Sequence, residues 1–226
     1  MTFNINDWMG ELTRRLKDAF GARLAAVGLQ GSFNRGEAHE QSDIDAVVIL
    51  DDLSLQDLAV YKNLLAQMPA SSHPACGFIS GREDLKNWPR AELFQFSFDT
   101  KTLYGSFEDI LPRPSRKDAL EAAQTGAGTL FHSLCHTQVH STMTPEFLAQ
   151  LYKGAFFVLR AVHFARSGRY LSSKTDLLRE LEGMDAEILN ILLEGNFPAG
   201  ADEKFLAWTQ RVLAYTAEEL NSFSLQ

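Results

Sequence analysis

Apolar and polar positions follow two different periods along the chain, and the period changes between residues 112 and 116. Before that point, short apolar runs separated by turn residues indicate strands mixed with a few amphipathic helices. Beyond it, apolar residues recur at helical spacing to the end of the chain. The pattern therefore predicts an α+β first domain at residues 1–112 and an all-helical bundle at residues 116–226, joined by the proline-containing segment 111–116.

In the first domain, the spacing of apolar residues also predicts the individual helices and strands. An amphipathic helix is predicted at residues 6–20, and a second helix after a capping-box sequence that begins at Ser54. Strands are predicted at residues 24–29, 43–50, 75–80 and 92–100. The last of these has the cleanest alternation, with Phe94, Phe96 and Phe98 on one face and Asp99 near the end of the other.

The helices of the second domain are delimited by their capping residues. Thr144 is expected as an N-cap with Pro145 at the first helical position, and Gly168 follows the end of that helix. A further helix is expected after Ser173, and the last spans about residues 202–222. Four or five helices in this arrangement predict a bundle.

Candidate chemistry gathers around one short stretch of the first domain. Gly31-Ser32 follows the first predicted strand, and Asp43 and Asp45 stand at the head of the second. Residues two apart on a strand share a face, so the two carboxylates are expected to be neighbours that repel each other. A divalent cation such as Mg²⁺, which prefers hard oxygen ligands, would relieve that repulsion.

This stretch resembles the signature of the DNA polymerase β-type nucleotidyltransferase superfamily: Gly-Ser, then Arg-Gly, then Ser-Asp-Ile-Asp within residues 27–50. The two-part plan is similar to that of small bacterial and aminoglycoside nucleotidyltransferases. The resemblance implies a mixed sheet with helices, followed by a helical bundle. It also implies Mg²⁺-dependent transfer of a nucleoside monophosphate from a nucleoside triphosphate to a hydroxyl of a small molecule or protein. One departure is Phe33, where many small members carry a basic residue; here Arg35 follows two residues later.

The resemblance also implies roles for particular residues. Asp43 and Asp45 would hold two Mg²⁺ ions, joined by a third carboxylate from a later strand. Asp99 is the candidate for that third ligand, with Glu92 and Glu83 as rivals.

Nucleotide binding is assigned to residues around the Gly-Ser turn and to one lysine of the second domain. The candidates are Gly31, Ser32, Arg35, Ser42 and Lys153. A lysine at position 153 lies within an apolar helix, so it either extends to solvent or points at a triphosphate.

Acceptor binding and any general base would come from the helical domain in the resembled enzymes. His132, His136 and His140 recur every four residues and share one helical face. Of these, His136 and His140 are the candidates for the acceptor side or the base. A His-x₃-His pair can equally bind a metal, or simply face solvent.

Composition narrows the class of partner. The net charge is −8 and the pI about 5.2, which argues against nucleic acid and favours a small-molecule or protein acceptor. Cys76 and Cys135 lack metal spacing and are expected to be reduced, as in the cytoplasm. Neither a signal peptide nor a membrane span is expected. The alternative function is a non-catalytic nucleotide-binding module, regulatory or antitoxin-like, and a homodimer is left open.

Overall fold

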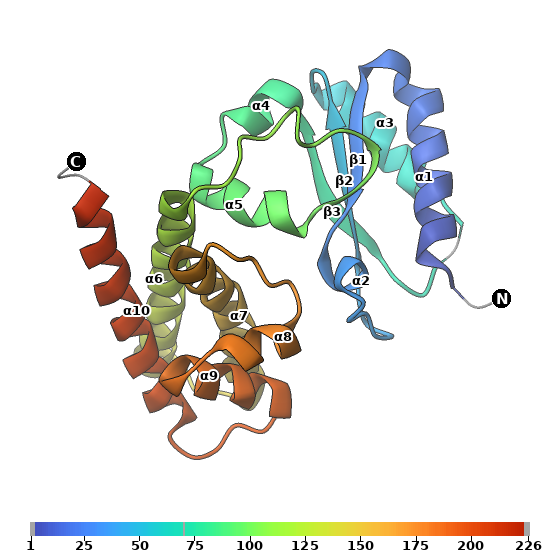
Figure 1. The fold of residues 1–226 in the computed structure, drawn as a ribbon. Coiled ribbons are helices and arrows are strands. Elements are labelled where there is room, and N and C mark those ends of the chain that lie inside the picture. The colour runs from blue at the N-terminus through green and yellow to red at the C-terminus, as the bar shows by residue number, and fades with distance from the viewer. Residues whose placement is uncertain (1–2, 70, 224–226) are drawn as a thin grey trace. The chain divides into compact units, whose positions relative to one another are not determined.

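The computed structural model describes residues 3–69 and 71–223, which group into two units (Figure 1). The first unit comprises Met1–Pro89 and Asp99–Arg113, and the second comprises Arg90–Phe98 and Pro114–Gln226. The chain therefore enters the second unit once, for the length of a single helix, before it leaves the first unit near residue 113. The division expected from the sequence does not include this excursion.

A mixed four-stranded sheet forms the centre of the first unit, with the strand order β3-β2-β1-β4. β1 is antiparallel to both β2 and β4, whereas β2 and β3 are parallel. The strands are β1 Leu24–Leu29, β2 Ile44–Leu50, β3 Ala75–Gly81 and β4 Lys101–Gly105. The first three confirm the strands expected from the apolar runs. β2 is an interior strand, and its apolar side chains are fully buried.

Two helices, α1 (Ile5–Phe20) and α3 (Leu55–Ala66), share one apolar core with this sheet. α1 contacts both β1 and α3 (Figure 1), and its apolar residues at every fourth position are buried as predicted. α3 begins with the expected capping box, in which the side chains of Ser54 and Asp57 each accept a hydrogen bond from the other residue's backbone N–H. The shorter elements of this unit are η1 Gly21–Arg23, α2 Gly31–Arg35 and α4 Arg82–Lys86.

The strand expected at residues 92–100 is wrong, because the segment forms helix α5 (Arg90–Asp99). Phe94 and Phe98 lie one helical turn apart, with ring centroids 5.4 Å from each other, and both rings contact Phe164 of the second unit. The alternating phenylalanines thus contain an i,i+4 pair that a helix can bury on one face. Packing of that pair into the second unit outweighs the local strand pattern.

The second unit is a helical bundle, as expected, built around a core of its own. Its remaining helices are α6 Arg116–His140, α7 Pro145–Ser167, α8 Lys174–Glu180, α9 Gly183–Glu194 and α10 Ala201–Phe223. α6 packs against α7 and α10, and α7 packs against α9. The helix starts agree with the predicted caps: Thr144 Oγ1 accepts a hydrogen bond from the Phe147 N–H, and Pro145 opens α7. Among the described residues, no helix combines the length and apolarity that crossing a membrane requires.

Candidate functional site

The Gly-Ser turn and the two aspartates meet at one edge of the sheet. β1 ends where β2 begins because the strands are antiparallel, and their register pairs Leu29 with Ala46. One residue further, the Gln30 N–H donates to the Asp45 carbonyl over 2.9 Å. This pairing places Gly31 directly beside Asp45. The expected turn and loop are in fact the first turn of the short helix α2.

Gly31 makes a close approach that a larger residue would prevent. Its φ of +69° lies in the left-handed region, which favours glycine. A Cβ at this position would lie 1.8 Å from Asp45 Oδ2, far inside van der Waals contact. The glycine is therefore required both by its backbone conformation and by the carboxylate that lies against it.

Electrostatics around Asp45 agree with a carboxylate pair. Burial raises the pKa of Asp45, the negative charge of Asp43 raises it further, and the charge of Arg35 partly opposes both effects. Asp43 is exposed and Asp45 is partly buried. Within residues 3–69 and 71–223, neither carboxylate has a hydrogen bond or an ion pair. The two carboxylates thus repel each other, and their oxygen lone pairs stay available for a ligand.

Arg35 is held near this pair by helix α2. Its side chain is only 12% exposed, and its Nε lies 3.3 Å from Glu37 Oε2. Phe33, which occupies the position that is basic in many resembled proteins, packs edge-on against His73, with ring centroids 5.0 Å apart. Arg35 is thus the described cation whose charge reaches Asp45, and Phe33 has an apolar packing role.

Ser42 and His73 shape the loop that precedes β2. The buried Ser42 Oγ accepts a hydrogen bond from the His39 N–H over 2.9 Å, and His73 Nδ1 lies 2.8 Å from the Ser42 carbonyl oxygen. Ser42 stays a predicted nucleotide-binding residue, and its hydroxyl oxygen fixes the loop that leads to Asp43. Gly31, Ser32 and Asp45 remain the residues that the fold brings together.

Asp99 lies at the same edge of the sheet, on the other side of β1. β4 pairs Lys101 with Leu29, and the Asn34 side chain donates to the Asp99 carbonyl over 2.8 Å. Nevertheless, no three His, Cys, Asp or Glu side chains among the described residues form a metal-binding group. Asp99 as a third ligand beside Asp43 and Asp45 therefore stays a prediction.

The rival carboxylates lie elsewhere, and two polar residues complete this edge. Glu83 forms an exposed ion pair with Lys86 over 2.7 Å, and Glu92 belongs to the second unit. Gln30 Nε2 donates to Thr100 Oγ1 over 2.6 Å. Gln30 and Asn34, which anchor α2 to the chain around residue 99, were not expected from the sequence. The feature of the sequence that could have indicated these two residues is their position, because their amide side chains flank the Gly31-Ser32 pair.

The donor set at this edge fits a hard divalent cation. Mg²⁺ is commonly bound in proteins by one or two carboxylates, with substrate phosphates and waters as its other ligands. Asp43 and Asp45 supply two such carboxylates. Burial and the charge of Asp43 both raise the pKa of Asp45, and a bound cation would offset this cost of ionisation. These two residues are therefore the candidates for holding Mg²⁺.

The site residues predicted in the second unit are exposed. Lys153 reaches solvent from α7, and His132, His136 and His140 line one exposed face of α6. The three imidazoles lie in sequence along the helix, with ring centroids 5.9 Å and 4.8 Å apart.

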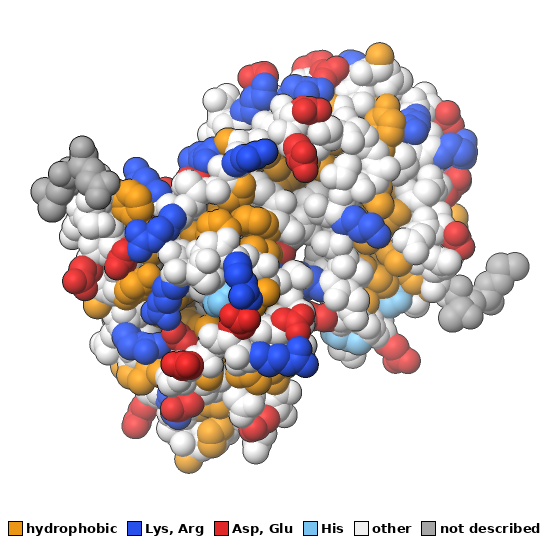
Figure 2. Space-filling model, in the orientation of Figure 1, with side chains coloured by type: hydrophobic (Ala, Val, Ile, Leu, Met, Phe, Trp, Pro, Cys, Tyr) orange, Lys and Arg blue, Asp and Glu red, His pale blue; other side chains and the backbone are white. Residues whose placement is uncertain are grey.

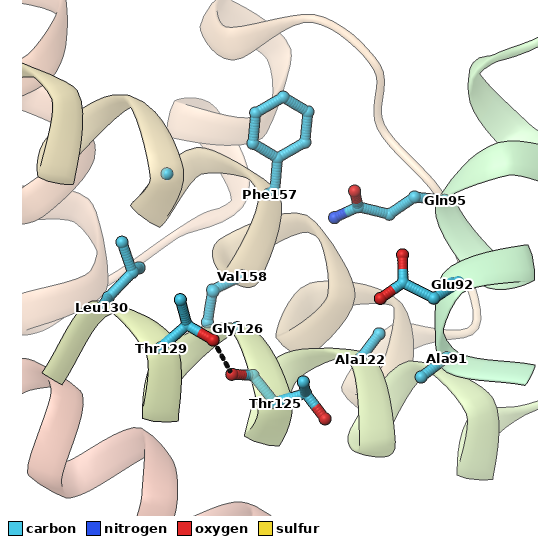
Figure 3. A pocket seen from close by; sticks show the side chains of 11 residues that line it. Ala91, Glu92, Gln95, Ala122, Thr125, Gly126, Thr129, Leu130, Phe157 and Val158 are labelled. Carbon is cyan, nitrogen blue, oxygen red and sulfur yellow. Dashed lines mark hydrogen bonds between the residues drawn. The ribbon is translucent and has the colours of Figure 1, made fainter. Parts of the chain in front are cut away.

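A pocket of about 310 Å³ in the second unit was not expected from the sequence. Glu92 and Gln95 project toward it from α5, and Phe157 and Val158 line it from α7 (Figure 3). Gly126 on α6 and Gly154 on α7 also line it, and a Cβ on Gly126 would meet the Val158 side chain at 2.8 Å. The other lining residues are Ala91, Ala122, Thr125, Thr129 and Leu130.

Comparisons with known proteins agree with this geometry. The family model described as "Nucleotidyltransferase domain" matches residues 9–117. The structure of spectinomycin adenyltransferase AAD(9) from Enterococcus faecialis, with ATP and spectinomycin, is similar with a TM-score of 0.60. It is 12% identical, and the match covers 95% of this chain and 100% of that chain, which indicates a shared fold.

Two further comparisons add little. A structure described as a toxin-antitoxin with AMP-PNP is 21% identical over 58% of this chain and 93% of that chain, but its TM-score of 0.30 is too low to indicate a common fold. No curated protein matches the sequence significantly. The family match identifies residues 9–117 as a nucleotidyltransferase domain, and the shared fold agrees with that assignment.

Proposed function

We propose that the protein transfers a nucleoside monophosphate from a Mg²⁺-bound nucleoside triphosphate to a hydroxyl group of a small molecule. The observation that carries this proposal is the carboxylate pair Asp43–Asp45, of which Asp45 lies against Gly31, and whose lone pairs are available. Structural acids in proteins are normally paired or hydrogen-bonded. A repelling pair at a nucleotidyltransferase Gly-Ser turn is better explained by a cation and a triphosphate.

Each residue of the edge has a task in this chemistry. Asp43 and Asp45 bind Mg²⁺, which, when bound, neutralises charge on the reacting phosphate and the departing pyrophosphate. Gly31 exposes its backbone where no side chain can interfere, and Ser32 provides a hydroxyl for a phosphate oxygen. Arg35, already close enough to influence Asp45, contributes a positive charge toward the triphosphate.

The chemistry of the acceptor is inferred from charge and from the pocket of the second unit. Lys and Arg side chains are interspersed with Asp and Glu over the face drawn in Figure 2, which together with the net charge of −8 argues against a polyanionic acceptor. The AAD(9) structure contains spectinomycin, a small molecule. The α5–α6–α7 pocket, with one carboxylate at Glu92, suits a hydroxyl-bearing ligand with a cationic group.

The test is a transfer assay with the full chain, each of the four nucleoside triphosphates, Mg²⁺ and a panel of aminocyclitol and aminoglycoside acceptors. Asp43→Asn and Asp45→Asn are expected to lower product formation on the order of 10³-fold, because each removes a carboxylate of the metal-binding pair. Asp51→Asn is the matched control, since Asp51 directly follows the opposite end of β2 and pairs with Arg82 on the surface.

The outcomes separate catalysis from binding alone. Equal turnover by the wild type and both aspartate variants would remove the proposed role of the pair. Tight Mg²⁺-dependent triphosphate binding without transfer to any acceptor would favour the non-catalytic nucleotide-binding module. For the pocket, Glu92→Gln is expected to raise the KM for the acceptor while leaving the affinity for the triphosphate unchanged.

A further inference from the structure

The exposed face of α6 carries three histidines that the proposed chemistry does not use. His132, His136 and His140 stand at successive helical turns, and all three side chains are exposed. Their rings approach one another in pairs, with centroids 5.9 Å apart for His132 and His136 and 4.8 Å apart for His136 and His140. Unlike an isolated surface histidine, each pair brings two imidazole rings together on one face of the helix.

These distances match what a shared metal ion requires. Zinc–nitrogen bonds of 2.0–2.1 Å in a tetrahedral arrangement place the centroids of two imidazoles about 5 Å apart. His136 and His140 already have this spacing, so small rotations of the rings suffice to bind one ion. His132 and His136 are farther apart and require a larger adjustment.

The surroundings of the pair are compatible with a cation. His140 lies in the last turn of α6, where the free backbone carbonyls carry partial negative charge. Gln138 lies between the two histidines in sequence but on another face of α6, where it donates to Asp202 of α10 over 2.7 Å. Val139 is 72% exposed, so the end of α6 is open to solvent.

We propose that His136 and His140 form a binding site for a divalent transition-metal ion, with His132 as an alternative partner of His136. Imidazole nitrogens select Cu²⁺, Ni²⁺ and Zn²⁺ over Mg²⁺, and Cu²⁺ binds most tightly in the general order of affinities. The site is therefore distinct in chemistry from the oxygen site at Asp43 and Asp45. Two protein ligands leave the remaining coordination positions to water or to a ligand from another molecule.

The experiment is a calorimetric titration of the full-length protein with NiCl₂ in a non-chelating buffer. The wild type is expected to take up one Ni²⁺ per chain. His136→Ala removes the residue shared by both pairs and is expected to weaken binding by about tenfold or more. His140→Ala leaves only the wider pair and should have a smaller effect, and His132→Ala should have the smallest.

Further measurements distinguish a loss of nickel binding at the histidines from unfolding and from nickel binding at Asp43 and Asp45. Circular dichroism should show unchanged helix content in the three variants, because the side chains are exposed. Electron paramagnetic resonance of bound Cu²⁺ should show coupling to two nitrogens in the wild type and not in His136→Ala. His39→Ala and the double variant Asp43→Asn/Asp45→Asn should retain nickel binding.

Three results would overturn the proposal. The first is no nickel uptake by the wild-type protein. The second is unchanged affinity in His136→Ala. The third is loss of nickel binding in the aspartate double variant with retention in the histidine variants, which would place the ion at the oxygen site.

Discussion

Asp45 in the first unit and Asp185 in the second are both withdrawn from solvent, yet their surroundings are opposite. Asp185, with a side chain only 3% exposed, accepts hydrogen bonds from Arg166 Nη1 over 2.9 Å and from Trp208 Nε1 over 2.8 Å, and it also pairs with Arg211. Asp45 instead faces another acid and the backbone of a glycine. One carboxylate is saturated with donors, and the other is left with its lone pairs available.

The difference separates acids that support the fold from acids that support chemistry. Asp57 belongs to the first kind: hydrogen bonds from Arg23 and then Ser54 hold its pKa well below the ordinary value. The pKa of Asp45 moves in the opposite direction. An acid whose ionised form is disfavoured by its own fold is a candidate for binding a cation, because only a ligand offsets that cost.

A large loss of transfer is expected where the fold presses a glycine against Asp45. Gly31→Ala introduces a Cβ at 1.8 Å from Asp45 Oδ2, so Asp45 must move, and transfer should fall on the order of 10²-fold. Gly36→Ala is the matched control, because Gly36 has a similar φ of +70° but open space around its Cβ position. It should cost about 1 kcal/mol of stability through backbone strain alone and leave transfer intact. Equal loss of transfer in both variants would mean that strain, rather than contact with Asp45, is responsible.

The second prediction concerns the saturated acid. Asp185→Ala leaves Trp208 Nε1 without its acceptor and separates two arginines from their shared partner, so the free energy of unfolding should fall by about 2–4 kcal/mol. Asp176→Ala removes an exposed acid paired with Arg179 on α8 and should change it by about 0.5 kcal/mol or less. Urea denaturation measures both. A negligible loss in Asp185→Ala would contradict the structural role.

The smallest effect is a gain in stability. The raised pKa of Asp45 means that the folded protein binds its proton more tightly than the unfolded chain, so the ionised carboxylate destabilises the fold as pH rises above 3.8. Without metal, Asp45→Asn should therefore raise the Tm at neutral pH, by about 2 °C.

The pH dependence provides the control for that gain. As the pH falls toward 3.8 and below, the carboxyl of Asp45 becomes protonated, so the difference in Tm between Asp45→Asn and the wild type should shrink. Asp43→Asn should give a smaller gain, because Asp43 is exposed and contributes repulsion but little burial. A fall in Tm at neutral pH would indicate that Asp45 is held by interactions that stabilise the fold.

Local patterns were sufficient to predict much of the first unit and the helices of the second. The buried stripe of α1, strands β1 to β3 and the caps at Ser54 and Thr144 each depend on residues close in sequence. The Gly31-Ser32 turn and the Asp43–Asp45 pair could be placed near each other because antiparallel pairing of neighbouring strands brings them together.

The remaining features depend on partners distant in the sequence. α5 is a helix because Phe94 and Phe98 pack against Phe164, which lies over sixty residues later in the printed sequence. The same applies to Asp185, whose donors come from α7 and α10. No local period encodes such contacts, so neither the α5–α6–α7 pocket nor the place of Asp99 could be predicted from the chain around them.

The most direct test of the account is a calorimetric titration of the protein with ATP in the presence and absence of Mg²⁺. The expected result is saturable, Mg²⁺-dependent binding by the wild type, with Asp43→Asn and Asp45→Asn losing the Mg²⁺ dependence. Mg²⁺-dependent binding of equal affinity in the wild type and both variants would contradict the assignment of the metal to this carboxylate pair.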